Sequence, residues 1–144
     1  MLPPGSDESP TLTFNTIGRH ISRMAYTKIT SVKSPWFIKS EINDLHAVPI
    51  SHGEGRFVGP LPLIRDLFTN GQVATRYVNQ DGAFADDMRG NPNGSHAAIE
   101  GITSPDGRVL GKMGHSERKG ENVAKNITGV KDQRIFESGV AYFQ

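Results

Sequence analysis

The segment from residue 20 to residue 30 alternates between two sets of side chains, and this pattern constrains the fold more than any other feature of the chain. One set occupies every second position from Ile21 to Ile29, and the other fills the positions between them, with β-branched residues enriched. A repeat of two residues is the repeat of a β-strand. We therefore predict a strand here, with both of its faces partly buried.

Shorter segments carry further strand signals. Runs rich in β-branched and aromatic residues predict strands at residues 35–39, at 47–51 continuing into His52, and at 72–78. A hairpin is expected where the turn sequence Ser104-Pro-Asp-Gly107 lies between residues 97–102 and 108–113. Strands therefore dominate the expected fold.

Helical signals are few. Residues 60–71 begin with prolines, end with Asn-Gly and carry apolar side chains at helical spacing, which predicts a short amphipathic helix. A second helix, packed on the sheet, is expected to close the chain after Val130. Residues 79–95 are rich in turn-forming pairs, so we expect a long ordered loop or a pair of tight turns, of the kind that usually serves a function. An α/β chain with so few helices suggests half of a fold.

The length of 144 residues suits one globular domain. Residues 1–10 contain almost no apolar side chains to bury and are expected to form a loose tail, which leaves residues 11–144 as the folded part.

The formal net charge is +1, so positive and negative residues are too evenly balanced for a protein that binds nucleic acid or anionic membranes through charge. Because neither a membrane-spanning run nor a signal peptide is found, we expect a cytoplasmic protein.

The chain contains no cysteine. This excludes disulfides, thiolate metal sites and a cysteine nucleophile supplied by these residues alone.

His115 and Glu117 follow directly on the strand expected at residues 108–113. They would therefore lie at the carboxyl end of that strand, where α/β folds place ligands and catalytic groups. A carboxylate two residues from a histidine can orient the imidazole and stabilise its charged form during proton transfer. The alternative from spacing alone is a surface turn with a solvated histidine.

Two glycine-containing loops are weaker candidates for a site. The stretch from Ser51 to Phe57 places His52 and Glu54 among glycines, and with His46 upstream a zinc site is conceivable. No His-Glu-x-x-His helix supports it, so we expect no metal. The stretch from Asn91 to Ser95 has the pattern of an ordered structural turn. Glycine-rich phosphate loops and the serine elbow of hydrolases are absent from the sequence.

Five motifs occur in an order that resembles a known family. They are His52-Gly-Glu-Gly-Arg56, Thr75-Arg-Tyr-Val78 with Asp81-Gly82, Asn91-Pro-Asn-Gly-Ser95, Gly101-Ile-Thr-Ser-Pro-Asp-Gly-Arg108 and Gly114-His-Ser-Glu-Arg118. In this order they resemble the glutaminase domain of phosphoribosylformylglycinamidine synthase, a class I glutamine amidotransferase domain, at the C-terminal end of the large single-chain form of the enzyme.

The resemblance implies an α/β fold: the later half of a flavodoxin-like, three-layer amidotransferase domain, strand-rich and truncated at its N-terminus. It assigns the histidine and glutamate of the catalytic triad to His115 and Glu117. The cysteine nucleophile, on its strand-turn-helix elbow, and the oxyanion hole belong to the earlier half, which this sequence does not match. Ser116 stands where the family commonly has proline, which implies a looser turn between the two catalytic residues.

The implied activity is release of ammonia from glutamine for the ATP-dependent conversion of formylglycinamide ribonucleotide to its amidine. The implied partners are glutamine, the earlier half of the domain and the synthetase domains, which would hold ATP and magnesium; no cofactor is expected in this chain. Six loop residues are expected to contact glutamine or a domain interface: His52, Glu54, Arg56, Asn91, Asn93 and Ser95. The chain alone is predicted to be inactive. The alternatives are a stand-alone interaction domain that has lost catalysis, or a gene fragment of an ordinary enzyme.

Overall fold

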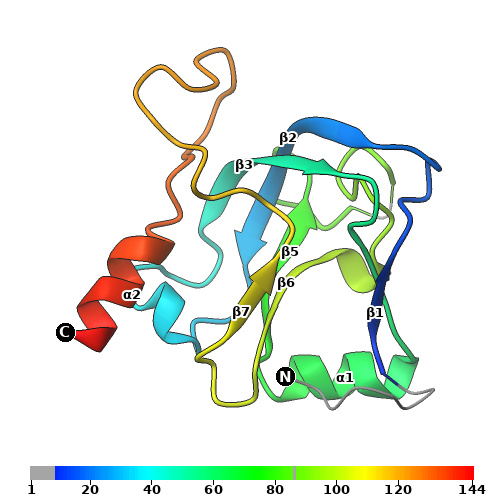
Figure 1. The fold of residues 1–144 in the computed structure, drawn as a ribbon, viewed down its shortest axis with the longest axis horizontal. Coiled ribbons are helices and arrows are strands. Elements are labelled where there is room, and N and C mark those ends of the chain that lie inside the picture. The colour runs from blue at the N-terminus through cyan, green and yellow to red at the C-terminus, as the bar shows by residue number, and fades with distance from the viewer. Residues whose placement is uncertain (1–8, 86) are drawn as a thin grey trace.

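A computed structural model describes residues 9–85 and 87–144. Its main feature is a five-stranded antiparallel sheet in the order β3-β2-β5-β6-β7 (Figure 1). The strands are β2 (Ile21–Ile29), β3 (Leu45–His52), β5 (Val73–Val78), β6 (Ile99–Thr103) and β7 (Leu110–Lys112). β3 and β7 are therefore the two edges of this sheet.

The alternating segment forms β2, as the sequence predicts. It pairs with β3 on one side, from Ile21 opposite His52 to Lys28 opposite Leu45, and with β5 on the other. Ala25, Thr27 and Ile29 are buried, and the residues between them are only half-buried. One face of β2 thus belongs to the core, while the other is partly exposed.

A second, smaller sheet joins β1 (Thr11–Thr13) and β4 (Arg56–Val58), with Thr11 opposite Val58. Neither strand was predicted from the sequence. Each has only three residues, too few to show a periodic pattern, and the two pair across more than forty positions of the chain.

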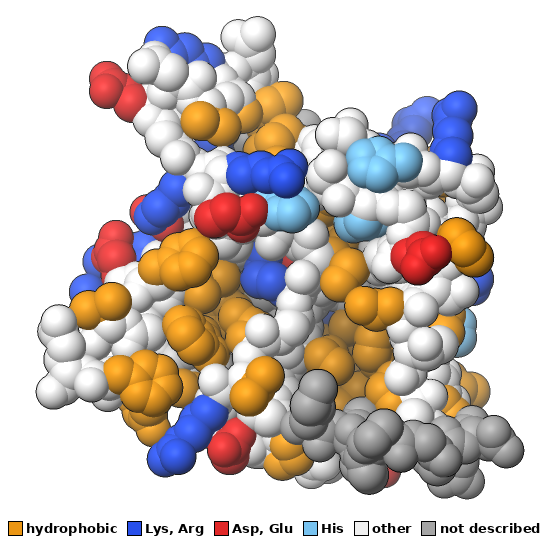
Figure 2. All heavy atoms as spheres, in the orientation of Figure 1, with side chains coloured by type: hydrophobic (Ala, Val, Ile, Leu, Met, Phe, Trp, Pro, Cys, Tyr) orange, Lys and Arg blue, Asp and Glu red, His pale blue; other side chains and the backbone are white. Residues whose placement is uncertain are grey.

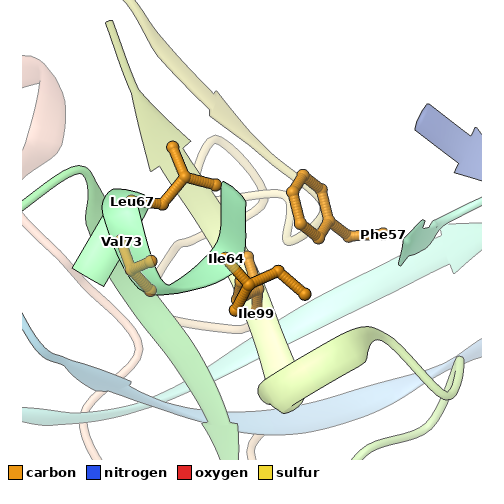
Figure 3. Packing of buried hydrophobic residues seen from close by; sticks show 5 residues of the cluster. All are labelled: Phe57, Ile64, Leu67, Val73 and Ile99. Carbon is orange, nitrogen blue, oxygen red and sulfur yellow. The ribbon is translucent and has the colours of Figure 1, made fainter. Parts of the chain in front are cut away.

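The first predicted helix is confirmed as α1 (Leu61–Thr69). Its Ile64 and Leu67 pack against Phe57 of β4, Val73 of β5 and Ile99 of β6 (Figure 3). This cluster of buried side chains fixes α1 against the sheet and ties the small sheet to the large one.

One expected strand segment is a helical turn instead. Residues 35–39 were expected to form a strand, but Pro35–Phe37 is a 3-10 helix, labelled η1. The Ser34 hydroxyl caps it by accepting a hydrogen bond from the backbone N–H of Trp36, and a proline at the first helical position favours such a start.

The hairpin is confirmed, but its first strand starts later than predicted. β6 begins at Ile99, because Ala97 and Ala98 have positive φ angles and belong to η2 (His96–Ala98). A left-handed backbone cannot continue a strand.

The C-terminal helix is α2 (Ile135–Phe143). It starts five residues later than Val130, after Arg134 in a left-handed conformation. Its main neighbour is η1 and not the sheet: the face of Gly139 lies so close to the Trp36 ring that an added Cβ would be 2.4 Å from it. Only Ile135, at its start, joins sheet residues in a core cluster.

The outer face of α2 is apolar. Figure 2 shows hydrophobic side chains gathered over this helix, and four of its residues are more than two-fifths exposed: Phe136, Val140, Tyr142 and Phe143.

The predicted loose tail falls mostly on residues 1–8, which lie outside the described residues. Within the described part of the chain, none of the helices is long and apolar enough to span a membrane.

Candidate active site

His115 and Glu117 lie in a turn that follows β7, as predicted from their position in the sequence. The backbone N–H of His115 donates to the carbonyl of Pro49 in β3, at 2.8 Å, and the N–H of Arg118 donates to the His115 carbonyl, at 3.1 Å. β3 and β7 are opposite edges of the sheet, so this contact shows that the sheet curls until its edges approach each other at the turn.

The structure brings the two side chains into direct contact. Nδ1 of His115 lies 2.7 Å from Oε1 of Glu117. The pKa of Glu117 is below its ordinary value, because its own backbone N–H stabilises the carboxylate and the His115 ring and the Arg118 charge add to this effect. An ionised carboxylate can only accept a hydrogen bond, so Nδ1 carries the proton and Nε2 of the neutral ring is left as a base.

An open depression of about 460 Å³ adjoins this pair. Besides His115 and Glu117, its walls include Trp36 of η1, Met113, Ile135 and Phe136. A base beside an apolar recess can exchange a proton with a group placed there.

Ser116 does not loosen the turn in the way that the missing proline ring implied. Its side chain is buried, and its Oγ lies 3.0 Å from Nζ of Lys112 and 2.5 Å from Oε1 of Gln133. These hydrogen bonds therefore restrain the turn, as the ring of a proline at position 116 would do.

The other predicted residues come together in a separate cluster, formed by the loop 91–95 and the segment that leads into β4. Asn93 is fully buried, and its side-chain amide donates to the Gly55 carbonyl and, at 3.3 Å, to the Tyr77 hydroxyl. Its Oδ1 accepts from the backbone N–H of Ser95, at 3.1 Å, and from the Ser95 hydroxyl, at 2.8 Å. All four hydrogen-bonding positions of this side chain are therefore used inside the protein.

Asn91, Ser95 and Arg56 support the same loop. Asn91 exchanges two hydrogen bonds with the backbone of Ser95, at 2.8 and 3.1 Å. The Ser95 hydroxyl accepts from the N–H of Phe57, at 3.0 Å, and Nε of Arg56 donates to the Gly94 carbonyl, at 3.1 Å. These contacts give the loop the ordered structure that its turn sequence predicted.

His52 and Glu54 differ from each other in burial. Burial lowers the pKa of His52, and its Nδ1 lies 3.1 Å from Oδ1 of Asn15. Glu54 is exposed. A role of these loop residues in binding stays a prediction.

Asn15 is a buried residue that the sequence analysis missed. Its amide donates to the carbonyls of His52, at 2.8 Å, and Arg19, at 3.1 Å, and its Oδ1 accepts from the N–H of Gly55, at 3.2 Å. It therefore joins two segments 37 positions apart. Nothing in the residues around Asn15 distinguishes it from an ordinary exposed asparagine.

The comparisons with known proteins identify the family of this chain. Residues 2–143 match the family described as the CobB/CobQ-like glutamine amidotransferase domain. Among curated relatives, phosphoribosylformylglycinamidine synthase subunit PurQ of Gloeobacter violaceus is 36% identical over 114 residues, which are 79% of this chain and 47% of that protein. The PurQ subunit of Methanosarcina barkeri is 32% identical over 131 residues, which are 91% of this chain and 54% of the relative.

A solved structure has the same fold. A chain in the structure of PurLQS from Thermotoga maritima superposes with a TM-score of 0.70 and 27% sequence identity, over 94% of this chain and 54% of that chain. The strand-rich α/β architecture expected from the motifs is thereby confirmed, and this chain spans about half the length of the relatives it matches. Because the family match covers nearly all of the sequence, the chain belongs to the CobB/CobQ-like glutamine amidotransferase domain family.

Proposed function

We propose that this chain forms the histidine-glutamate half of the glutaminase site of phosphoribosylformylglycinamidine synthase. The observation that carries the proposal is the hydrogen bond of 2.7 Å between His115 and Glu117, in a turn at the end of β7. The PurQ relatives support the choice of this enzyme, since their names give the same synthase.

The proposed reaction begins with a cysteine thiolate that attacks the side-chain carboxamide carbon of glutamine. The C–N bond breaks, and the imidazolium of His115 gives its Nε2 proton to the departing nitrogen, which leaves as ammonia. Nε2 then takes a proton from water as the water attacks the thioester, so that the C–S bond breaks, glutamate leaves, and the cysteine thiolate and the imidazolium are restored. Glu117 holds the ring by its Nδ1–H and stabilises its charged form.

The cysteine must come from outside these residues, because this sequence contains none. We therefore expect the 144-residue chain to release no ammonia from glutamine on its own. The proposed partner is the remaining part of the amidotransferase domain, with its cysteine and oxyanion hole.

An apolar groove of about 320 Å³ supports such a partner. It lies between the small sheet and β6–β7, and its walls include Leu12, Phe57, Ile99, Ile102 and Met113. The rest of the domain would cover this groove, which otherwise meets water.

The ammonia would pass to synthetase domains, where ATP and magnesium activate the ribonucleotide. We propose no cofactor for this chain itself. A non-catalytic interaction domain is the second candidate function, and the lack of cysteine is the feature that favours it.

The test uses a protein in which this sequence is joined to the cysteine-containing half and the synthetase. We expect His115→Ala to lower glutamine-dependent activity by about 10²–10⁴-fold, because general acid-base assistance is lost. Activity with free ammonia should stay unchanged, since ammonia bypasses the glutaminase site. Glutamine-dependent activity at the parent level in His115→Ala would overturn the proposal.

A matched pair of variants tests the carboxylate. Glu117→Gln should lower glutamine-dependent activity, though less than His115→Ala, because the ring remains but loses its orienting charge. Glu121→Gln makes the same change on an exposed residue four positions later and should leave the activity unchanged.

A further inference from the structure

A buried ion pair lies directly beneath the turn that carries His115 and Glu117. Nζ of Lys112 is 3.2 Å from Oε1 of Glu100, and the exposed fractions of the two side chains are 11% and 0%. Charged groups are rarely buried at this depth unless every polar atom finds a partner.

The ammonium group of Lys112 has such partners. Besides Glu100, it donates to the carbonyl of Gly114, at 2.8 Å, and to Oγ of Ser116, at 3.0 Å. Its three protons therefore meet three acceptors. Gly114 and Ser116 are the two neighbours of His115, so one ammonium group holds the chain on both sides of the histidine.

The Glu100 carboxylate is also fully engaged. Its Oε2 accepts from the hydroxyl of Thr75, and its Oε1 accepts from the backbone N–H of Gly114, at 2.6 Å, in addition to Lys112. Glu100 lies on β6 and Thr75 on β5. The ion pair is thus anchored to the interior strands of the sheet.

The hydrogen bonds continue beyond Ser116, and each group in the series accepts from the group before it and donates to the next. An ammonium group cannot accept, so Oγ of Ser116 accepts from Lys112 and gives its own proton to Oε1 of Gln133, at 2.5 Å. The Gln133 amide then donates to the hydroxyl of Thr27 on β2, at 3.2 Å. Gln133 and Thr27 are each 1% exposed.

We propose that Lys112, Ser116 and Gln133 are positioning residues, which set the direction of the His115 imidazole through these hydrogen bonds to the turn. This role rests on the proposed function, because orientation of the ring matters only if His115 transfers protons. A displacement of about 1 Å in a catalytic group can cost about 10²-fold in rate.

The first test measures the ring itself in the 144-residue chain, by NMR relaxation of a selectively labelled His115. Ser116→Ala should lower the order parameter of the ring, from about the 0.85 of rigid groups towards the 0.6 of flexible ones, and should speed exchange of the Nδ1 proton. Ser116→Thr keeps the hydroxyl and should restore both values. Ring order in Ser116→Ala equal to the parent value would overturn the proposal.

A pair of lysine variants extends this test. Lys112→Met should loosen the ring as Ser116→Ala does, whereas Lys125→Met, on an exposed loop residue, should not. Because Lys112→Met leaves the Glu100 charge buried and unpaired, it can fail to fold. Ser116→Ala carries the test in that case, with its melting temperature measured alongside.

The second test measures kinetics in the protein that contains the complete domain. We expect Ser116→Ala to lower kcat with glutamine by about 10-fold to 10²-fold, with KM within about 2-fold of the parent value, and Ser116→Thr to recover most of the loss. If His115→Ala abolishes glutamine-dependent activity but Ser116→Ala leaves kcat unchanged, the positioning role is wrong and the proposed function stands. If His115→Ala retains full glutamine-dependent activity, the proposed function is wrong. The positioning role is then wrong as well, even if the NMR test shows that Ser116 orders the ring.

Discussion

Two polar clusters of this protein are built on opposite principles. In the cluster around Asn93, buried amide and hydroxyl groups bond to one another and to the backbone. In the turn after β7, the buried hydrogen bonds of Lys112 and Ser116 hold the backbone on both sides of His115. The side chains of His115 and Glu117 themselves are 30% and 55% exposed. Within the described residues, no hydrogen bond engages Nε2 of His115. The Asn93 cluster uses its donors and acceptors inside the protein, whereas the turn after β7 leaves Nε2 of His115 available at the surface.

The difference separates residues that hold a loop from residues that can act on a ligand. Asn93 has no free donor or acceptor for glutamine, so a direct binding role would require the loop to open. His115 needs no rearrangement before it can exchange a proton. Among the residues singled out by the sequence motifs, geometry therefore favours His115 and Glu117 for chemistry and the asparagine loop for structure.

The largest expected effect that tests this comparison is on stability. Asn93→Ala should lower the free energy of unfolding by about 2–4 kcal/mol, because the Gly55 carbonyl and the Ser95 hydroxyl proton would stay buried without their partner. Urea unfolding followed by circular dichroism measures this loss.

Glu54→Ala is the matched control in the neighbouring loop. The side chain is exposed, so the change should alter stability by less than about 0.5 kcal/mol. If Asn93→Ala were as stable as Glu54→Ala, the asparagine cluster would not be the structural element described above.

A smaller effect is expected from pH, through two histidines of β3. Burial lowers the pKa of both His46 and His52 below the usual 6.5, and His46 is only 6% exposed. Below pH 6.5 the unfolded chain therefore takes up protons that the folded chain does not, so the free energy of unfolding falls as the pH falls. For His46 the loss is at most about 1.4 kcal/mol for each pH unit.

Melting temperatures at pH 7.5, 6.5 and 5.5 test this expectation. This range lies above the usual titration of the carboxylates, and so isolates the histidines. His46→Gln, which stays neutral, should flatten the dependence. A melting temperature that rises towards pH 5.5 would contradict the assignment.

The parts of the fold that the sequence predicted are those with a local signal. The two-residue alternation of β2 and the helical spacing of apolar residues in α1 are each complete within one segment, and the hairpin contains its own turn sequence. The position of His115 and Glu117 followed from the strand that precedes them. Their contact distance, by contrast, required the structure.

The parts that were missed depend on residues far apart in the chain. β1 and β4 stabilise each other across the fold, and Asn15 holds His52 from 37 positions away. The strand expected at residues 35–39 became η1 because Ser34 caps it and because the Trp36 ring packs on α2. The hydrogen bond between Ser116 and Gln133 was missed for the same reason, because the two residues are 17 positions apart.

The smallest expected effect concerns the dyad itself. The contact of 2.7 Å joins two partly exposed side chains, and even a fully charged pair at an exposed site contributes only about 0–1 kcal/mol to stability. His115→Ala and Glu117→Gln should therefore each change the free energy of unfolding by less than about 0.5 kcal/mol, although both are expected to impair glutamine-dependent activity. Urea unfolding of the two variants beside Asn93→Ala gives the comparison directly. A loss of 2 kcal/mol or more in Glu117→Gln would mean that this pair, like the asparagine cluster, holds the structure together, and its separate role as a surface base would have to be abandoned.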